Sequence, residues 1–357
     1  IVFTLISFTA CTKNETKNNV SVSNDNKVEI NDDLGDHYIL SDDDQPFYVS
    51  RSDMMAFNGE GSYCFLNDCL YYTQNKNTVP VCNKPDCGHI TNVDDGKSEC
   101  NAFFSNERYY YEKGFSYYKD SIYLLGLSRE CDLGSKSDLT VSIYKVSKDG
   151  SNHREICKLC KTSDINSVGE FAVHRGYAFW TAINSKGNFC IYKLNINSPQ
   201  YKTEIFRCKD NAGFISRFAC VGNYMYFSYS YSENEDYENY KGEIYRLNIN
   251  TDKKEKLIDT NSCFTVFNNK IYYFKDRDMN AYDLKSGKIF PICQNKDKSA
   301  IVVSDHNYIY YTNWDNGIAE PEDYVLHIID EEGKVINDVN IPDCEYFVGS
   351  DGRRLYM

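Results

Sequence analysis

The stretch Cys263–Ile292 reads CFTVFNNKIYYFKDRDMNAYDLKSGKIFPI, and it shows the pattern on which the fold prediction rests. Four short runs of aromatic and aliphatic residues alternate with polar residues, and polar turns such as Asn268-Asn269 separate the runs. An alternation of period two predicts strands that bury one face. Because a four-stranded meander of this length is not stable alone, we expect it to pack against similar units.

The same signature recurs along the chain. A polar pair or a Gly-containing turn is followed by an aliphatic residue or Tyr, and then by aromatic residues. The copies are spaced by about 48 residues on average, which is the period of a propeller blade. They lie at 67–72, 119–123, 175–179, 222–226, 268–273, 306–310 and 352–356.

This repeat predicts an all-β fold, a β-propeller with four-stranded blades. Blades stacked radially cover one another's faces and leave only short, protected edges. The copies of the signature favour seven blades, and six is the alternative number. The last copy offers two strands, so we expect residues 37–40 and 47–50 to complete the ring by pairing the two chain ends. A solenoid or a sandwich is the alternative architecture.

The composition agrees with a β fold and excludes one class of partner. Tyr and Phe are abundant, at 31 and 20 residues, and they suit pleated surfaces. Ala and Leu, which favour helices, are scarce. The chain has 39 Lys and Arg against 52 Asp and Glu, a net charge of −13. An acidic surface repels phosphate backbones, so we do not expect nucleic-acid binding.

The first residues predict an exported, lipid-anchored protein. Residues 1–10 are too few to cross the ~30 Å hydrocarbon layer and are typical of a truncated lipoprotein signal peptide. The sequence Phe8-Thr9-Ala10-Cys11 resembles a bacterial lipobox, which makes Cys11 the lipidation site, and residues 11–36 have the composition of a disordered tether. The alternative is a free or buried Cys11 in a clipped signal. We therefore expect an extracytoplasmic protein that contacts the cell membrane through its lipid anchor alone.

A Cys-rich insertion at 82–100 lies within the propeller domain predicted for residues 37–357. Its spacing is C-x4-C-x-H-x10-C. Three thiolates and one imidazole suit tetrahedral zinc at a structural site, whereas an oxidising exterior favours a disulfide, with the remaining Cys unpaired or bridged to Cys64 or Cys69. We favour the disulfide, and with either chemistry we expect the insertion to order a long polar loop. The residues concerned are Cys82, Cys87, His89 and Cys100.

Several short segments carry a resemblance to known proteins. They are CNKPDCGH at 82–89, CNAF at 100–103, VSKDG at 146–150 and HRGY at 174–177. On these residues the chain resembles, over residues 37–357, propeller lipoproteins of anaerobic Gram-positive bacteria that form a domain of unknown function and are related to TolB-like and YWTD propellers. The resemblance implies a propeller on a lipid anchor, and it implies no activity.

The sequence offers weak candidates for ligand binding and none for catalysis. No nucleophile elbow of the type Gly-x-Ser-x-Gly occurs near a predicted helix. The stretch Tyr224–Tyr240 mixes Tyr with carboxylates and amides, which would suit a sugar or a peptide, and two His precede strands of different blades. The candidate ligand-binding residues are Ser228, Tyr231, Tyr237, Tyr240, His174 and His306.

We therefore expect a binding or interaction module on the cell surface, whose partner is a carbohydrate, a peptide or an envelope protein. The site would lie in the propeller funnel and its loops. The alternative is an extracytoplasmic hydrolase or lyase that acts on a polymeric substrate at the propeller channel. Two carboxylates, or a His and a carboxylate, converging on the channel would favour the enzyme.

Overall fold

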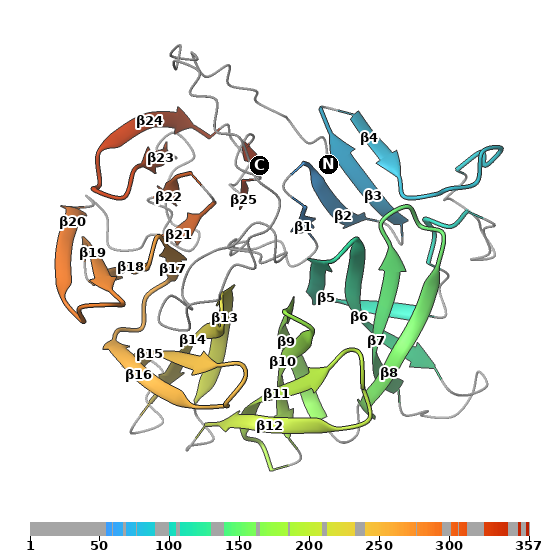
Figure 1. Ribbon diagram of the computed structural model, residues 1–357, viewed down its shortest axis with the longest axis horizontal. Coiled ribbons are helices and arrows are strands. Elements are labelled where there is room, and N and C mark those ends of the chain that lie inside the picture. The colour runs from blue at the N-terminus through green and yellow to red at the C-terminus, as the bar shows by residue number, and fades with distance from the viewer. Residues whose placement is uncertain are drawn as a thin grey trace, which may run out of the picture.

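The computed structural model of the chain is a ring of β-sheets around a central axis (Figure 1). It describes residues 55–58, 60–66, 69–75, 77–89, 100–104, 108–129, 139–161, 165–184, 186–208, 213–232, 240–275, 277–294, 301–305, 307–312, 325–341, 349–350 and 355–356. Within these residues six sheets have four antiparallel strands each, so the predicted β-propeller is confirmed, with six four-stranded blades.

Blades 1 to 3 follow one another along the first half of the ring. Their strands are β1 (Met55–Phe57), β2 (Ser62–Leu66), β3 (Cys69–Gln74), β4 (Asn77–Pro80), β5 (Arg108–Tyr118), β6 (Ser121–Arg129), β7 (Leu139–Ser147), β8 (His153–Lys161), β9 (Ile165–His174), β10 (Tyr177–Asn184), β11 (Phe189–Asn195) and β12 (Lys202–Arg207).

Blades 4 to 6 continue the ring, and a two-stranded sheet follows them. Their strands are β13 (Phe214–Val221), β14 (Tyr224–Tyr231), β15 (Lys241–Asn248), β16 (Lys254–Asp259), β17 (Phe264–Phe267), β18 (Lys270–Lys275), β19 (Asp278–Asp283), β20 (Ile289–Gln294), β21 (Ile301–Ser304), β22 (Ile309–Thr312), β23 (Val325–Ile329), β24 (Val335–Asn340), β25 (Gly349–Ser350) and β26 (Leu355–Tyr356).

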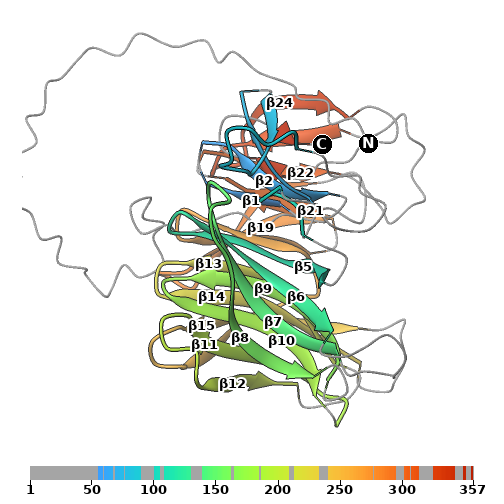
Figure 2. The same ribbon diagram turned by 90° about the vertical axis from the view of Figure 1, so that its right-hand side faces the viewer.

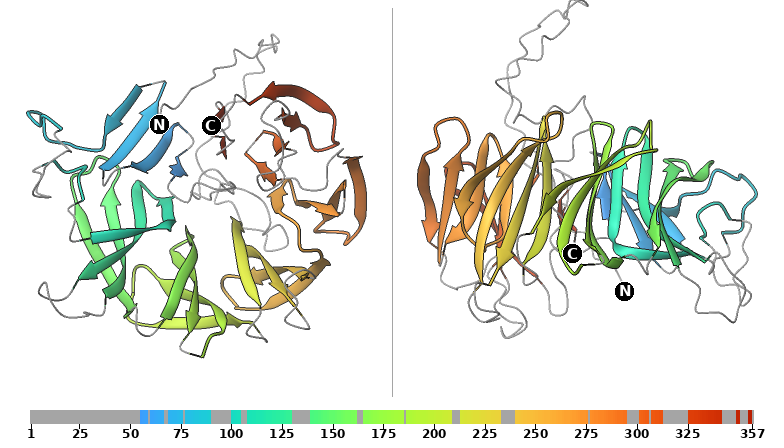
Figure 3. Two further views of the ribbon diagram at one scale, coloured as in Figure 1. Left: turned by 180° about the vertical axis from the view of Figure 1, so that it is seen from behind. Right: turned by 90° about the horizontal axis from the view of Figure 1, so that it is seen from below.

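Every four-stranded blade is a meander whose strands pair in chain order. The first strand of each blade is the innermost, and first strands of neighbouring blades contact one another around the axis, from β1 through β5, β9, β13 and β17 to β21 (Figure 1). The view from behind shows the same ring of blades, and in the side views the sheets of neighbouring blades stand next to one another (Figures 2 and 3).

Burial decreases from the axis to the rim, and the sequence follows this gradient. The four residues of β17 are all buried, and so are the four central residues of β18. The outermost strands β16 and β24 are almost entirely exposed. This explains why the second strand β18 reads Ile-Tyr-Tyr, apolar on both faces, whereas the outermost strand β16 begins Lys-Glu-Lys.

The hydrophobic core of the protein lies between the blades. One cluster joins Trp180 of blade 3 to Ile143 of blade 2, another joins Phe179 of blade 3 to Phe227 of blade 4, and a third joins Tyr226 of blade 4 to blade 5. All five of these residues are at most 1% exposed. Each blade is therefore stabilised by the sheets on its two sides.

Polar contacts also cross from one blade to the next. The ring Nε2 of His174 and the carbonyl O of Gly222 lie 2.6 Å apart, between blades 3 and 4. The largely buried Lys193 of blade 3 donates to the carbonyl O of Ile249 at 2.6 Å and to Oδ1 of Asp252 at 2.7 Å. A buried ammonium group needs such partners, so these contacts fix the relative position of the two blades.

Two details differ from the sequence prediction. Within the described residues the number of four-stranded blades is six, because the part of the seventh copy that they include contributes the pair β25–β26, and β25 contacts β21. In blade 1 the signature lies on the third strand, β3, and not on the second as in blade 5, because β1 and β2 both precede it. The strands predicted at 37–40 and 47–50, the signal peptide and the tether lie outside the described residues. Within the described part of the chain, no helix has the length and apolar character that crossing a membrane requires.

The contacts of Lys193 generate a test of the blade 3–blade 4 junction. Lys193→Met should lower the free energy of unfolding by about 1–3 kcal/mol, because it leaves a buried carbonyl and a carboxylate without their charged donor. Denaturant titration followed by tryptophan and tyrosine fluorescence measures the change. The matched control is Lys256→Met, which removes the surface ion pairs of Lys256 with Glu243 and Asp259 and should leave the midpoint unchanged. Equal effects of the two substitutions would show that Lys193 does not join the blades.

Candidate metal centre

The segment that links blade 1 to blade 2 runs from the end of β4 to the start of β5, and it carries the predicted Cys-rich cluster. Backbone hydrogen bonds attach it to blade 1: Val81 N donates to Leu70 O, and Leu70 N donates to Ala102 O, both at 2.8 Å. Cys69 and Phe103 form a further β-bridge. Both arms of the segment, residues 81–89 and 100–104, therefore bond to the start of β3.

The structure brings the four predicted residues together. One ligand atom from each of Cys82, Cys87, His89 and Cys100 lies within 4.8 Å of the other three. The Nδ1 atom of His89 is 3.6 Å from Sγ of Cys100. Two sulfurs bound to tetrahedral zinc at ~2.3 Å stand ~3.8 Å apart. The donor atoms are therefore close to the arrangement that a metal would impose.

Local geometry explains how residues far apart in sequence reach this arrangement. Cys87 N donates to the carbonyl O of Lys84 at 3.3 Å, which folds the first arm into a tight turn. Nδ2 of Asn101 donates to Oδ1 of Asn83 at 2.6 Å and joins the second arm to the first. His89 has a φ of 49°, in the left-handed region that non-glycine residues rarely adopt. This backbone conformation directs the chain so that His89 shares a site with the cysteines.

The sulfur atoms differ in their acidity. Partial burial of Cys82 acts to raise its pKa. The net shift is nevertheless downward, because Cys82 accepts hydrogen bonds from the backbone N–H groups of Lys84 and Asn101 and from the neighbouring thiols. Burial raises the pKa of Cys100 to about 12. Burial also raises the pKa of Cys69, which packs beside the cluster. In the absence of a metal, Cys82 is therefore more acidic than Cys100.

The structure joins none of the cysteines of the described residues in a disulfide, Cys64, Cys69, Cys82, Cys87 and Cys100 included. The disulfide that we favoured from the sequence is therefore not found here. The donor set of three thiols and one imidazole fits the alternative, a tetrahedral site of the kind that holds zinc.

The cluster sits beside the interface of blades 1 and 2. Val81 and Phe104, from the two arms, belong to a hydrophobic cluster that includes Leu70 of blade 1 and Ile122 of blade 2. Gly150, in the β7–β8 turn, has a φ of 74°, and a Cβ there would lie 2.0 Å from the carbonyl O of Val81. The backbone of the linking segment thus packs directly against blade 2, and the cluster holds that segment in place.

The difference in acidity predicts a difference in reactivity. In metal-free protein, iodoacetamide should alkylate Cys82 much faster than Cys100 at neutral pH, because the thiolate is the reacting form and Cys100 remains protonated. Raising the pH should speed the labelling of Cys100 and change Cys82 less. Peptide mass spectrometry over a time course measures both rates. Equal rates at neutral pH would contradict the difference in acidity between Cys82 and Cys100. The buried Cys190 serves as the unreactive reference.

The other predicted residues do not gather at one place. His174 is 1% exposed and takes part in the blade 3–blade 4 contact. Ser228 is buried, and its Oγ lies 2.8 Å from Oγ of Ser216. Tyr231 stacks on Tyr229 with ring centroids 5.1 Å apart. Tyr240 packs edge-on against Phe214, which is 37% exposed. Tyr237, His306 and Cys11 lie outside the described residues, so these predictions stand as they were.

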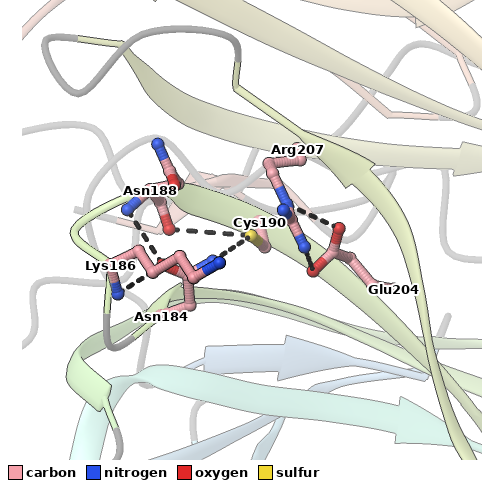
Figure 4. Close-up of polar contacts among 6 residues, drawn as sticks. All are labelled: Asn184, Lys186, Asn188, Cys190, Glu204 and Arg207. Carbon is pink, nitrogen blue, oxygen red and sulfur yellow. Dashed lines mark hydrogen bonds and ion pairs between the residues drawn. The ribbon is translucent and has the colours of Figure 1, made fainter.

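A second polar cluster surrounds Cys190 in blade 3 (Figure 4). Nδ2 of Asn184 donates to Sγ of Cys190 at 3.4 Å, and Sγ is 3.6 Å from the carbonyl O of Asn188. Arg207 forms two hydrogen bonds of 2.8 Å with Glu204 beside it. Burial and then the charge of Glu204 raise the pKa of Cys190. The thiol therefore stays protonated, which makes this cluster a structural contact and not a nucleophile.

Two residues of the inner strands, Glu170 in β9 and Arg217 in β13, were not singled out from the sequence. In the sequence, each is a single charged residue within a predicted strand. The signal that finds them is their position directly before the Phe that recurs in the first strands of the blades.

The fold is similar to that of solved propeller proteins. An oligogalacturonate lyase from Vibrio parahaemolyticus has a TM-score of 0.51 at 9% identity, with 77% of this chain and 76% of the lyase covered. A prolyl endopeptidase has a TM-score of 0.51 at 11% identity, with 79% of this chain and 41% of that protein covered. Likeness at this identity shows the propeller fold alone. No protein-family model and no curated protein matches the chain.

Proposed function

We propose that the protein is a zinc-stabilised β-propeller that works as a binding module on the outer face of the cell membrane. Its partner would be a carbohydrate, a peptide or an envelope protein. The lipobox-like sequence before Cys11 and the resemblance to propeller lipoproteins support the location. Partition of the exported chain into a detergent phase, lost in Cys11→Ser, tests the anchor.

Zinc would bind to Cys82, Cys87, His89 and Cys100, and its contribution would be structural. The observation that supports it is the closeness of the four donor atoms, 4.8 Å or less, in a segment with few buried apolar residues. With all four coordination positions filled by protein, such a site leaves no open position for a substrate. The metal would fasten the linking segment across blades 1 and 2.

Native mass spectrometry tests the proposed zinc binding. The wild-type chain should carry one zinc ion, and Cys87→Ser or His89→Ala should lose it, whereas Cys190→Ser should keep it. Chelation should lower the thermal midpoint, because a metal at a thousandfold excess over its Kd contributes about 4 kcal/mol to the folded state.

The proposed site predicts the direction in which zinc affinity changes with pH. Zinc must displace the proton of Cys100, whose pKa is raised to about 12 in the metal-free protein, so zinc affinity should rise with pH throughout the neutral range. Titration with a competing chelator at several pH values measures this. An affinity that is independent of pH would contradict the displacement of a proton from Cys100. A chain that gains two hydrogens on reduction and carries no metal would show a disulfide instead.

The composition of the inner strands supports binding over catalysis. Among inner-strand residues whose side chains the structure describes, there is one carboxylate, Glu170, and one imidazole, His174. His174 is buried, with its ring against the carbonyl O of Gly222. General acid–base catalysis needs two such groups in reach of one substrate. The inner strands described here do not offer that pair.

An array of glycans and peptides tests the function directly. The full-length chain in detergent should bind a subset of the array saturably, and mass spectrometry of the bound compound should show it unchanged after prolonged incubation. Cleavage or elimination of the compound would instead establish the hydrolase or lyase. Failure to bind any member of the array, including isolated envelope polymers, would contradict the binding role.

A further inference from the structure

The first strands of four consecutive blades carry the same residue type at the same distance in sequence from the turn that follows. In each, a Phe stands four residues before the first residue of the turn that follows, and that turn residue has a positive φ. Three of these Phe side chains are at most 8% exposed, and the fourth, Phe115, is partly buried against the blade 1–blade 2 cluster. The four residues are Phe115, Phe171, Phe218 and Phe264.

The residue before this Phe differs from blade to blade. It is Gly114 in blade 2, Glu170 in blade 3, Arg217 in blade 4 and Cys263 in blade 5. Gly114 and Cys263 are fixed by packing, because a Cβ on Gly114 would lie 2.5 Å from Leu125 and Cys263 packs against the core between blades 5 and 6. Glu170 and Arg217 are instead charged and partly exposed. Because the first strands line the axis, these positions form part of a ring around it (Figure 1).

Two members of this ring carry opposite charges and lie on strands that touch. The inner strands β9 and β13 contact each other across the junction of blades 3 and 4. Glu170 and Arg217 are both partly exposed. Within the described part of the chain, no hydrogen bond or ion pair involves the carboxylate of Glu170.

Both residues stand in β-bulges. In β9, Gly169 and Glu170 together stand opposite Thr181, and a Cβ on Gly169 would lie 2.5 Å from Oγ1 of Thr181. In β13, Arg217 is the inserted residue, with a φ of 61°. A bulge re-aims a side chain out of the regular alternation of the strand. A left-handed conformation at a non-glycine residue is unfavourable, and such strain gathers at functional sites.

We infer that Glu170 and Arg217 form a binding site at the axis, between blades 3 and 4, for a small ligand that carries a carboxylate and hydrogen-bond donors. The planar guanidinium of Arg217 matches a carboxylate with two parallel hydrogen bonds. The carboxylate of Glu170 accepts from a hydroxyl or an ammonium group of the same ligand. In a chain with a net charge of −13, Arg217 supplies the local positive charge that an anionic ligand needs. This inference rests on the proposed binding role and gives it a site.

Sugar acids and amino acids share this chemistry, and matched probes separate them. Glucuronate with glucose as its neutral counterpart forms one arm, and alanine with alaninamide forms the other. Isothermal titration of the full-length chain in detergent should show binding of at least one carboxylate probe, and no binding of its neutral counterpart at the same concentration.

The decisive variant is Arg217→Gly. Glycine adopts a positive φ without strain, so this substitution should leave the thermal midpoint unchanged or slightly raised. It should weaken binding of the carboxylate probe by roughly tenfold to a hundredfold, the effect of losing charge-assisted hydrogen bonds. Glu170→Gln should weaken the same probe by about tenfold, since it removes the charge that attracts the donor groups. The control is Asn269→Gly, at a φ of 59° in the β17–β18 turn of blade 5, which should change neither quantity.

Three results would overturn the site: no binding of any carboxylate probe to the wild-type chain, wild-type affinity in Arg217→Gly, or equal losses in Asn269→Gly and Arg217→Gly. Failure of this site can be told apart from failure of the proposed function as a binding module. If Arg217→Gly still binds its partner on the glycan and peptide array, the module binds elsewhere, and the site at the axis is wrong.

Discussion

The structure depends on one constraint: each blade has apolar residues on both faces, and it can bury them only against the two neighbouring blades. The core clusters show this, since each of those described in blades 2 to 6 draws residues from two adjacent sheets. A sheet of four short strands has too little area to stabilise itself. Stability is therefore shared around the ring, and a junction between blades matters as much as the blades themselves.

This constraint gives the Cys-rich segment a physical purpose. Blade 1 is built from short strands, of three residues in β1 and four in β4, so it offers less apolar area than its neighbours. The linking segment adds Val81 and Phe104 to the junction with blade 2. Its polar composition could not hold it there by burial. The metal that we propose, bound to four side chains, would supply the missing stabilisation, because coordination does not require buried apolar area.

The same constraint explains where specific chemistry can appear. Positions that pack between blades must be apolar, and Phe171 and Phe218 show this at equivalent places. The adjoining bulged positions escape the packing requirement, so they can hold Glu170 and Arg217. The loops and the strand residues nearest the axis are therefore the parts of a propeller that can vary without loss of the fold.

The sequence by itself determined the class of fold. Strand periodicity and the recurrent turn are local properties, and the spacing of the repeats carries over directly to the blades because each blade is a meander of consecutive strands. The spacing of Cys82, Cys87, His89 and Cys100 also indicated one shared site, since all four lie within a short segment. Tertiary structure decided the remainder. Whether the cysteines pair with each other or surround a common point depends on the positions of two arms fixed by blade 1. Whether Glu170 and Arg217 are neighbours depends on the contact between β9 and β13, which joins residues about 47 positions apart, one blade repeat. The burial of His174 likewise depends on the adjacent blade, because the partner of its ring, Gly222, belongs to that blade.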